Sequence, residues 1–417
     1  MKPAEHDEGE LPFEEETPDD LEARWARKRA GQRRVLLGVG AFLLLGLGLQ
    51  FLAPLLAPLA IREGPMLQQP TETSAVLVWT QNHDRPTTIR VKTAGGDDVP
   101  AIVTGTGRAR RVALTGLIPA TAYEYTISAG DKQLAGGRFH TAKPRGQAFS
   151  FIVFGDTGKA TQGQFRIGAR IAAESPDFIV HTGDVVYPDG SRDDYYQRFF
   201  QPYRAVLRDI ALWPSLGNHD VRDFEGEPYR EVFDLPANGP AGLPAEHSYW
   251  FDYADARFVV VDSNLNEAVL RDTVAPWVAA VFGEPTTPKW RFAVLHHPPY
   301  TAGKHRPSDE VARTLVPVFE KAGVTAVFSG HDHLYERSRP LRGGQIVTPR
   351  EGIVYIVSGA GGANLYSFQS PESQPAWLAA GRDDVHSYTR ITIDGDRLTL
   401  VQIDADGRVL DEISWTR

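Results

Sequence analysis

Two histidines one residue apart, His331 and His333, stand in the sequence GHDHLYER directly after an apolar run. The run, residues 324–328, has the length and composition of a buried strand. Neutral imidazole is a common ligand of protein-bound iron and zinc. The chain has only 12 histidines in 417 residues, so a pair at the end of a buried strand indicates a metal site and prompts a search for its other ligands.

Four more short apolar runs end in polar residues of types that bind metals. The four polar blocks are Gly155-Asp156-Thr157-Gly158, Gly183-Asp184-Val185-Val186-Tyr187, Gly217-Asn218-His219-Asp220 and His296-His297-Pro298-Pro299-Tyr300. Sites of open α/β sheets assemble at the carboxyl ends of strands, and the glycines permit tight turns and close backbone approach. We therefore expect all five blocks to contribute to one shared metal site.

The five blocks, in this order, resemble the signature of the metallophosphoesterase superfamily, and within it that of the purple acid phosphatases. That signature reads GDxG, GDxxY, GNH(D/E), a histidine block and GHxH. Any one block alone is more typical of a turn, a cap or a packed side chain. Related phosphoesterases carry GDxH at the first block, where this chain has Gly158. The resemblance extends from Pro65 to the C-terminus.

The resemblance implies two metal ions. By motif position, the first ion would be held by Asp156, Tyr187 and His333. The second ion would be held by Asn218, His296 and His331, and Asp184 would bridge the two ions. Tyrosine favours Fe(III) at the first position, where the phenolate gives this family its purple colour. The second ion would be a divalent Fe, Zn or Mn. The chain contains no cysteine, which leaves only oxygen and nitrogen ligands for either ion.

The resemblance also implies catalytic residues that bind no metal. His219 follows the ligand Asn218, so it would reach the phosphate or the leaving-group oxygen and contribute electrostatic stabilisation or a proton. Asp220 would orient the ring of His219, as carboxylates near metal sites often do.

Two further histidines near this block have open roles. His305 falls nine residues after His296, where plant-type members also carry a histidine, and it is a candidate for protonating the leaving group. An exposed loop histidine without a catalytic role is a nearly equal alternative. His297 is ambiguous, because family members often have serine there. We assign His296 as the ligand since Pro298 then falls two residues after it, as the family pattern requires.

Short apolar runs alternate with helical stretches from Phe149 onward, as is typical of strands buried on both faces. This pattern predicts an α/β fold, the α/β/β/α metallophosphoesterase sandwich, over residues 146–417. The predicted strands are 149–154, 177–181, 257–262, 291–296, 324–329 and 351–359, followed by a meander over 388–413. The predicted helices are 165–174 and 309–323.

A small all-β domain is predicted over residues 63–145. Its expected strands, rich in β-branched and aromatic residues and separated by Gly, Pro and Asp turns, are 73–80, 87–93, 110–117, 122–130 and 136–142. The stretch LTGLIPATAYEYTI resembles the fibronectin type III pattern, so a fibronectin III-like sandwich is expected. Tyr123 and Tyr125 are expected to pack in its core.

The N-terminal region predicts a membrane anchor. Residues 1–34 form a tail that is first acidic and then basic, and the apolar run 35–61 is long enough to span a bilayer as a transmembrane helix. Because the basic cluster precedes the run, the tail would be cytoplasmic and the catalytic domain extracytoplasmic, in a single-pass protein of the cell membrane. A cleaved signal peptide is the alternative interpretation, although its apolar region is usually shorter.

Charge and motifs together narrow the function. The formal net charge of -9 argues against nucleic acid as a partner. We expect a membrane-anchored phosphatase that hydrolyses small phosphate monoesters by attack of water activated by two metals. The alternatives are a phosphodiesterase, nucleotidase or lipid-phosphate phosphatase of the same superfamily, and a non-catalytic surface protein that has kept the fold.

Overall fold

The computed structural model describes residues 57–416 apart from positions 106, 370, 371 and 373, together with positions 19, 22–23, 25–30, 33 and 36. The chain divides into two units, Met1–Pro58 and Leu59–Arg417. Most of the predicted tail and anchor, 1–34 and 35–61, lies outside the described residues. Among those that are described, no helix is both long and apolar enough to span a membrane.

The first part of the second unit is built from two antiparallel sheets, each four-stranded within the described residues, with the orders β1-β2-β6-β5 and β4-β3-β7-β8. The strands are β1 (Ile61–Gln68), β2 (Ser74–Gln81), β3 (Thr88–Thr93), β4 (Asp98–Val99), β5 (Ile102–Thr104), β6 (Ala109–Thr115), β7 (Ala122–Ala129) and β8 (Lys132–His140). Leu77 and Leu114 of one sheet share a core with Tyr123 and Tyr125 of the other. The predicted β-sandwich and its tyrosine core are confirmed, whereas its assignment to the fibronectin type III family stays a prediction.

Strand β1 was not predicted from the sequence, although it joins the sandwich to the rest of the unit. Gly64 and Pro65 interrupt its pattern, and proline is confined to edge strands because it cannot donate a ladder hydrogen bond. Glu63 of β1 accepts two hydrogen bonds from Arg192, at 2.9 and 2.5 Å. The strand begins at Ile61, so the last residue of the apolar run predicted as an anchor is a strand residue.

Two larger sheets form the rest of the unit. Within the described residues the first is six-stranded, in the order β11-β10-β9-β21-β22-β23, and the second is seven-stranded, in the order β12-β13-β14-β15-β19-β16-β20. The strands of the first are β9 (Phe149–Phe154), β10 (Phe178–His181), β11 (Ala211–Pro214), β21 (Ser387–Asp394), β22 (Arg397–Asp404) and β23 (Val409–Thr416). Those of the second are β12 (Tyr249–Tyr253), β13 (Ala256–Val261), β14 (Trp290–Leu295), β15 (Ala326–Ser329), β16 (Tyr335–Ser338), β19 (Val354–Ser358) and β20 (Leu378–Arg382). A small hairpin, β17 (Leu341–Arg342) with β18 (Gln345–Ile346), lies apart from both.

Helices cover the outer faces of the two sheets. They are α2 (Gln162–Glu174), α3 (Gln201–Leu207), α4 (Glu227–Val232), α5 (Glu267–Val269), α6 (Ala275–Gly283), α7 (Asp309–Thr314) and α8 (Val316–Ala322), with short turns at Arg192–Asp194, Tyr196–Phe200, Phe224–Gly226 and Leu270–Val274. The helical stretch predicted over 309–323 is confirmed, but it forms two helices, α7 and α8, in place of one. The helix breaks at Leu315, because Pro317 has no N–H to donate to the preceding turn.

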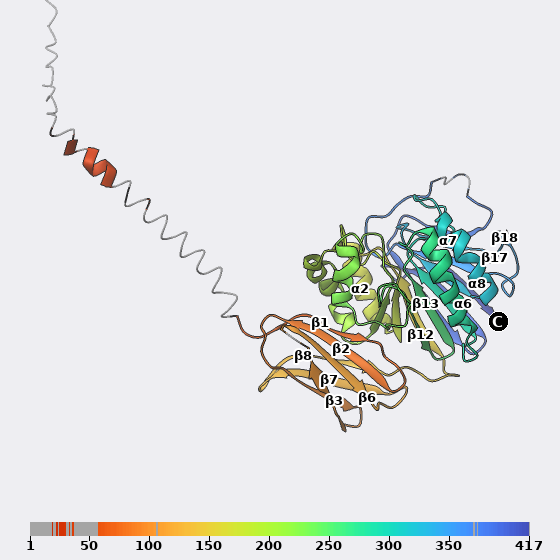
Figure 1. Ribbon diagram of the computed structural model, residues 1–417, viewed down its shortest axis with the longest axis horizontal. Helices are drawn as coiled ribbons and strands as arrows, with labels where there is room; N and C mark the ends of the chain where they lie inside the picture. The colour runs from red at the N-terminus through yellow and green to blue at the C-terminus, as the bar shows by residue number, and fades with distance from the viewer. Residues whose placement is uncertain are drawn as a thin grey trace, which may run out of the picture. The chain divides into compact units, whose positions relative to one another are not determined.

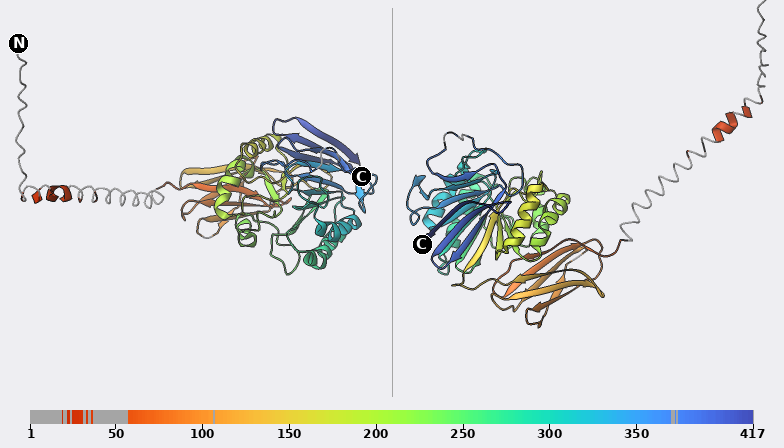
Figure 2. Two further views of the ribbon diagram at one scale, coloured as in Figure 1. Left: turned by 90° about the horizontal axis from the view of Figure 1, so that it is seen from above. Right: turned by 180° about the vertical axis from the view of Figure 1, so that it is seen from behind.

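Side-chain alternation along the strands shows the layer order. Phe151 of β9 makes edge-on ring contacts with Phe258, Phe292 and Phe328 of the other sheet, with centroids 5.1 to 6.0 Å apart. The neighbouring Val259 belongs instead to the core beneath α6 and α8. Figures 1 and 2 show α2 on one side of the strands and α6, α7 and α8 on the other. The predicted α/β/β/α arrangement is therefore confirmed, and the C-terminal meander extends the first sheet beside β9.

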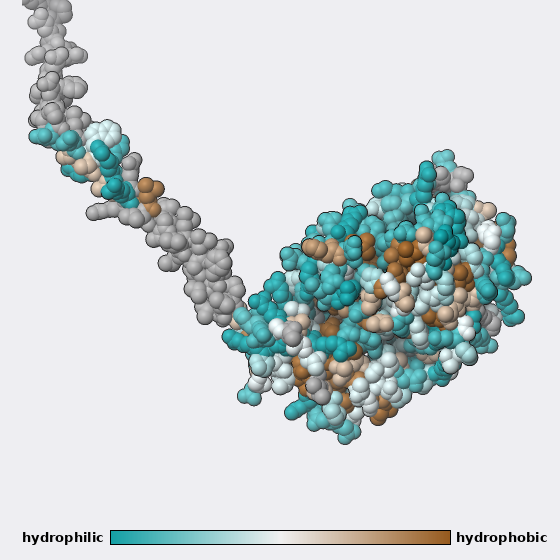
Figure 3. All heavy atoms as spheres, in the orientation of Figure 1, coloured by the Kyte–Doolittle hydropathy of each residue, from teal (hydrophilic) through white to brown (hydrophobic). Residues whose placement is uncertain are grey.

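The surface of the Leu59–Arg417 unit mixes polar and apolar residues. On the face drawn in Figure 3, hydrophobic residues form small separate areas among hydrophilic ones. Large exposed apolar side chains such as Phe165, Phe224 and Ile346 come from distant parts of the chain. Scattered apolar residues of this kind are normal for a solvent-exposed surface.

Candidate metal centre

The five polar blocks begin where five strands end. Strands β9, β10 and β11 are parallel neighbours in one sheet, and β14 and β15 are parallel neighbours in the other. Parallel strands in register bring their carboxyl ends to the same edge, as Phe154 opposite His181 and His181 opposite Pro214 show. This register explains why blocks far apart in the sequence converge.

The ligands predicted for the first ion lie together. Nε2 of His333 lies 2.9 Å from the Tyr187 hydroxyl and 3.6 Å from Oδ1 of Asp156. The Tyr187 hydroxyl lies 3.5 Å from the same Asp156 oxygen. Asp156, Asp184 and His333 each offer a ligand atom within 4.8 Å of the others. These atoms are close enough to one another to hold a single cation.

The ligands predicted for the second ion lie beside this group. Nε2 of His296 lies 3.1 Å from Oδ1 of Asn218 and 3.5 Å from Oδ1 of Asp184. The rings of His296 and His331 have centroids 5.1 Å apart. Asp184 is therefore close to both ligand sets, as a bridging carboxylate must be.

Three of these candidate ligands have an unusual backbone conformation. Asp156, Asp184 and His331 have φ angles of 57°, 53° and 72°, in the left-handed region. Non-glycine residues there cost about 1 kcal/mol or more, and they cluster at functional sites. Hydrogen bonds hold the turns: His331 N donates to Oδ1 of Asp156 at 3.0 Å, and His219 N donates to Oδ1 of Asp184 at 2.9 Å.

Two glycines allow the blocks to approach this closely. A Cβ atom at Gly217 would lie 2.1 Å from Oδ1 of Asp184, so any side chain there would displace the central carboxylate. A Cβ atom at Gly158 would lie 2.0 Å from the Val185 carbonyl oxygen. This backbone therefore has no room for the histidine of GDxH enzymes, in agreement with the GDxG motif.

The electrostatics of the site fit a bound cation. Asp156 and Asp184 are both buried. Burial, and then the charge of Asp184, raises the pKa of Asp156 well above its usual range. In the part of the chain that the structure describes, the ion-pair partners of these carboxylates are histidines, with no lysine or arginine among them. Because buried carboxylates are costly without a positive partner, the donor set suits metal ions.

The histidines are prepared as neutral ligands. Burial lowers the pKa of His296 well below its usual range and that of His333 to about 4. Nδ1 of His296 lies 2.8 Å from the Thr182 carbonyl oxygen, and Nδ1 of His333 lies 2.7 Å from that of Asn364. A carbonyl oxygen only accepts, so Nδ1 carries the proton and the lone pair of Nε2 faces the site, as metal binding requires.

His219 lies at the site, but Asp220 does not orient it. Nε2 of His219 lies 3.9 Å from Oδ2 of Asp184, and its Nδ1 contacts the Pro188 carbonyl oxygen. The Asp220 carboxylate instead accepts hydrogen bonds from the backbone N–H groups of Val185, Val186 and Gly217, at 2.9 to 3.1 Å. The prediction that Asp220 orients the ring of His219 is thus wrong. The Asp220 side chain instead connects the second polar block to the third, and the Pro188 carbonyl group positions the His219 ring.

His305 also lies at the site. Its ring centroid is 4.1 Å from that of His331 and 5.5 Å from that of Tyr366. Its backbone N–H donates to Oδ1 of Asp332 at 2.9 Å. His305 is half-buried. His305 is therefore not a fully exposed loop histidine, and whether it has a catalytic role stays a prediction.

Sequence reasoning missed several residues of the site. Tyr366 stacks on His333 with centroids 3.9 Å apart and an interplanar angle of 11°. The ammonium groups of Lys159 and Lys304 lie 4.7 and 4.1 Å from the ring centroids of Tyr187 and Tyr366. The glycine-rich stretch SGAGGANLY, residues 358–366, predicts a turn that packs close to the metal centre, although not the stacking of Tyr366 on His333. The two lysines have no pattern that separates them from ordinary surface lysines.

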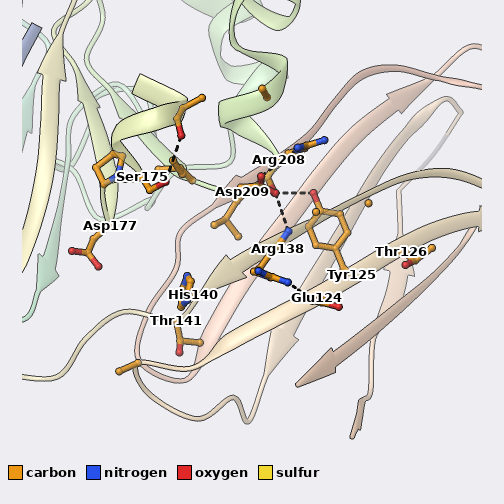
Figure 4. A pocket seen from close by; sticks show the side chains of 18 of the residues that line it. Glu124, Tyr125, Thr126, Arg138, His140, Thr141, Ser175, Asp177, Arg208 and Asp209 are labelled. Carbon is orange, nitrogen blue, oxygen red and sulfur yellow. Dashed lines mark hydrogen bonds and ion pairs between the residues drawn. The ribbon is translucent and has the colours of Figure 1, made fainter. Parts of the chain in front are cut away.

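A large cavity lies elsewhere in the unit. It has a volume of about 760 Å³ and is lined by residues of β7, β8 and the segments around α2 and α3. Figure 4 shows Glu124, Arg138 and Asp209 close to one another on one side of this cavity. Arg138 pairs with Glu124, and Lys143 lies 2.8 Å from Asp177. None of the predicted site residues lines this cavity, so it is separate from the metal centre.

Comparison with protein families agrees with this geometry. The model described as calcineurin-like phosphoesterase matches residues 149–335, which include every predicted site residue. Residues 149–335 therefore form a calcineurin-like phosphoesterase domain. A second model, described as iron/zinc purple acid phosphatase-like protein C, matches residues 352–412 of the phosphoesterase, from just before β19 into β23.

Individual relatives point the same way. The phosphoesterase is 25% identical over 313 residues to Purple acid phosphatase 4 of Arabidopsis thaliana, covering 65% of this chain and 84% of that protein. It is 25% identical over 327 residues to a nucleotide pyrophosphatase/phosphodiesterase of Hordeum vulgare, covering 64% of this chain and 82% of that protein. A solved purple acid phosphatase from yellow lupin seeds has the same fold, with 19% identity, a TM-score of 0.74, and coverage of 85% of this chain and 74% of that one. The phosphoesterase is accordingly a metal-dependent hydrolase of the acid phosphatase type.

Proposed function

We propose that this phosphoesterase hydrolyses small phosphate monoesters at a dinuclear centre of Fe(III) and a divalent Fe, Zn or Mn ion. One observation carries the proposal: Nε2 of His296 and Oδ1 of Asn218 face each other at 3.1 Å. The His296 Nδ1–H is donated to the Thr182 carbonyl oxygen, so Nε2 and the amide oxygen are both acceptors. Two acceptors directed at one point favour a cation between them.

The residues of the site divide into metal ligands and groups that face the substrate. When bound, the two ions would polarise the phosphoryl oxygen and activate the attacking water. His219 lies close enough to the Asp184 carboxylate, at 3.9 Å, to reach a phosphate bound there. Lys159 and Lys304 add positive charge beside the centre, which favours an anionic substrate. His305 is the candidate for protonating the leaving group.

The two ligand sets differ in character. The first offers two oxygens, from Asp156 and Tyr187, and one imidazole; an oxygen-rich set with a phenolate favours Fe(III). The second has the amide oxygen of Asn218 and the imidazoles of His296 and His331, which suits a borderline divalent ion. Asp184 would supply the shared negative charge.

A second candidate function is hydrolysis of phosphodiesters or nucleotides at the same centre, and a lipid phosphate is a further substrate of this class. The relative named as a nucleotide pyrophosphatase/phosphodiesterase favours this second function. The proposed metal ligands do not decide between the two functions, because they would bind the metal ions and not the leaving group of the substrate. The complete ligand set argues against a non-catalytic surface protein.

Assays on the full-length protein test this function. The purified chain is loaded with iron and zinc, its metal content is measured, and p-nitrophenyl phosphate is compared with bis(p-nitrophenyl) phosphate. A monoesterase releases p-nitrophenol faster from the monoester. Faster release from the diester would replace the first candidate with the second, and no metal-dependent release from either would exclude both.

We also propose that the enzyme is anchored in the cell membrane by the part of the apolar run 35–61 that precedes β1, with its catalytic domain extracytoplasmic. The apolar run and the basic cluster that precedes it support this arrangement. An extracytoplasmic site would reach phosphate esters that cannot cross the membrane.

A further inference from the structure

His297 has no role in the ligand set described above, yet it lies within the second half of the centre. Its ring centroid is 5.0 Å from that of His296 and 4.7 Å from that of His331. His296, His297 and His331 each offer one ring nitrogen, and these nitrogens all lie within 4.8 Å of one another. Three imidazoles at this spacing are suited to binding one ion.

The orientation of His297 matches that of the other ligand histidines. Its Nδ1 lies 2.9 Å from the hydroxyl oxygen of Ser263, and its backbone N–H donates to the same oxygen at 3.1 Å. His296 and His333 likewise have Nδ1 against an oxygen, the carbonyls of Thr182 and Asn364. A contact at Nδ1 holds the ring in place, and when Nδ1 donates its proton, as it can to a hydroxyl oxygen, Nε2 keeps the lone pair that binds a metal.

Ser263 itself is held by the fold. It follows β13, the strand next to β14 in the parallel part of the sheet, and it is 7% exposed. The loop that carries His297 and the loop that carries Ser263 therefore leave neighbouring strands at the same edge. A histidine held by a buried hydroxyl loses little additional freedom on binding an ion, which favours a ligand over a loose surface side chain.

We propose that His297 is an additional imidazole ligand of the second metal ion, together with His296, His331 and Asn218. This inference rests on the proposed two-metal function and specifies its second ion. Three imidazoles make that position richer in nitrogen than the first. Imidazole suits zinc and iron, whereas manganese prefers oxygen ligands. The second position should therefore select Zn²⁺ or Fe²⁺ over Mn²⁺.

The test replaces His297 with the smaller residue that family members often carry there. Full-length wild type and His297→Ser are loaded with iron, and the affinity of the second position for Zn²⁺ and for Mn²⁺ is measured by competition with a chelator. His297→Ser should bind Zn²⁺ roughly 10- to 100-fold more weakly, an effect of the size seen when contacts around metal ligands are lost. Its Mn²⁺ affinity should change less, and its iron content should stay at the wild-type level.

A matched control and a second probe complete the test. His305→Ala removes another ring next to His331 and should leave the Zn²⁺ affinity unchanged. With Co²⁺ in the second position, the visible spectrum should differ between wild type and His297→Ser, because the spectrum reports the ligands directly. If wild type binds two ions but His297→Ser has an unchanged Zn²⁺ affinity and Co²⁺ spectrum, the role of His297 as a ligand is wrong while the proposed function stands. Fewer than two ions in wild type would overturn the proposed function itself.

Discussion

Nε2 of His296 lies 3.1 Å from Oδ1 of Asn218, although 78 positions separate the two residues. Asn218 follows β11 of one sheet and His296 follows β14 of the other. Burial lowers the pKa of His296 well below its usual range, so the ring is neutral and Nε2 has a free lone pair. The two sheets thus place two electron-pair donors face to face, and a metal ion between them accounts for both.

His219 should affect turnover without affecting metal content. The His219→Ala substitution removes a ring that is 3.9 Å from Asp184 but is not a proposed ligand. The rate should fall roughly 10²- to 10⁴-fold if the ring acts as a positioned acid or electrostatic stabiliser. Steady-state kinetics and elemental analysis of the same samples check this. His140→Ala, an exposed histidine of the sandwich, serves as control, and loss of metal from His219→Ala would contradict the assigned role.

Tyr187 should give the protein a colour. If its phenolate binds Fe(III), the oxidised protein should show a broad visible absorption band that reduction shifts and that Tyr187→Phe abolishes. The physical reason is that charge transfer needs both the phenolate and the ferric ion. Absorption spectra of wild type and variant test this. A colourless protein that is fully active with only zinc or manganese would exclude the iron assignment.

Glu336 should make the protein less stable as the pH rises. Burial raises its pKa from 4.5 to about 8, although the Ala302 N–H donates to both carboxylate oxygens. Between these values the unfolded chain loses a proton that the folded chain keeps. The free energy of unfolding therefore falls with rising pH, by up to about 1.4 kcal/mol per pH unit from this group. Glu336→Gln should flatten the dependence between pH 5 and 8 in denaturant titrations, and an unchanged slope would show that Glu336 ionises normally.

Much of the centre could be predicted because its ligands follow apolar strands. The predicted strand 149–154 coincides with β9, and the other runs agree with β10, β13, β14, β15 and β19 within three residues at each end. A strand buried on both faces has a strong local signal, and the polar residue at its end is then conspicuous. The candidate ligands Asp156, Asp184 and His333, which the structure brings close together, were identified in this way.

The remaining features depend on contacts that no local pattern encodes. Asp220 bonds to backbone N–H groups of another block, which only the folded backbone brings near. Tyr366, in the segment between β19 and β20, stacks on His333, which precedes β16. The contact of Ser263 with His297 joins two loops on neighbouring strands. In each case the sequence shows which residue type is present but not which residue it contacts in the fold.

The proposed topology predicts a one-sided pattern of proteolysis. If the apolar run that precedes β1 spans the membrane, protease added to intact cells or spheroplasts should digest the catalytic domain and spare the acidic tail. The reason is that the bilayer would shield only what lies on the cytoplasmic side. Immunoblots with antibodies to each end check this. A catalytic domain that resists protease until the cells are lysed would contradict the outward orientation.

Replacing the shared carboxylate tests the dinuclear centre most directly. Asp184→Asn keeps the size of the side chain but removes the charge between the two ligand sets, and a neutral amide is a poor bridge between cations. Metal content, phosphate release and circular dichroism are measured on the full-length wild type and variant. We predict two metal ions per chain in wild type, and in the variant a folded protein with less metal and a rate lower by orders of magnitude. An Asp184→Asn protein that retains both ions and near-normal turnover would contradict the two-metal assignment.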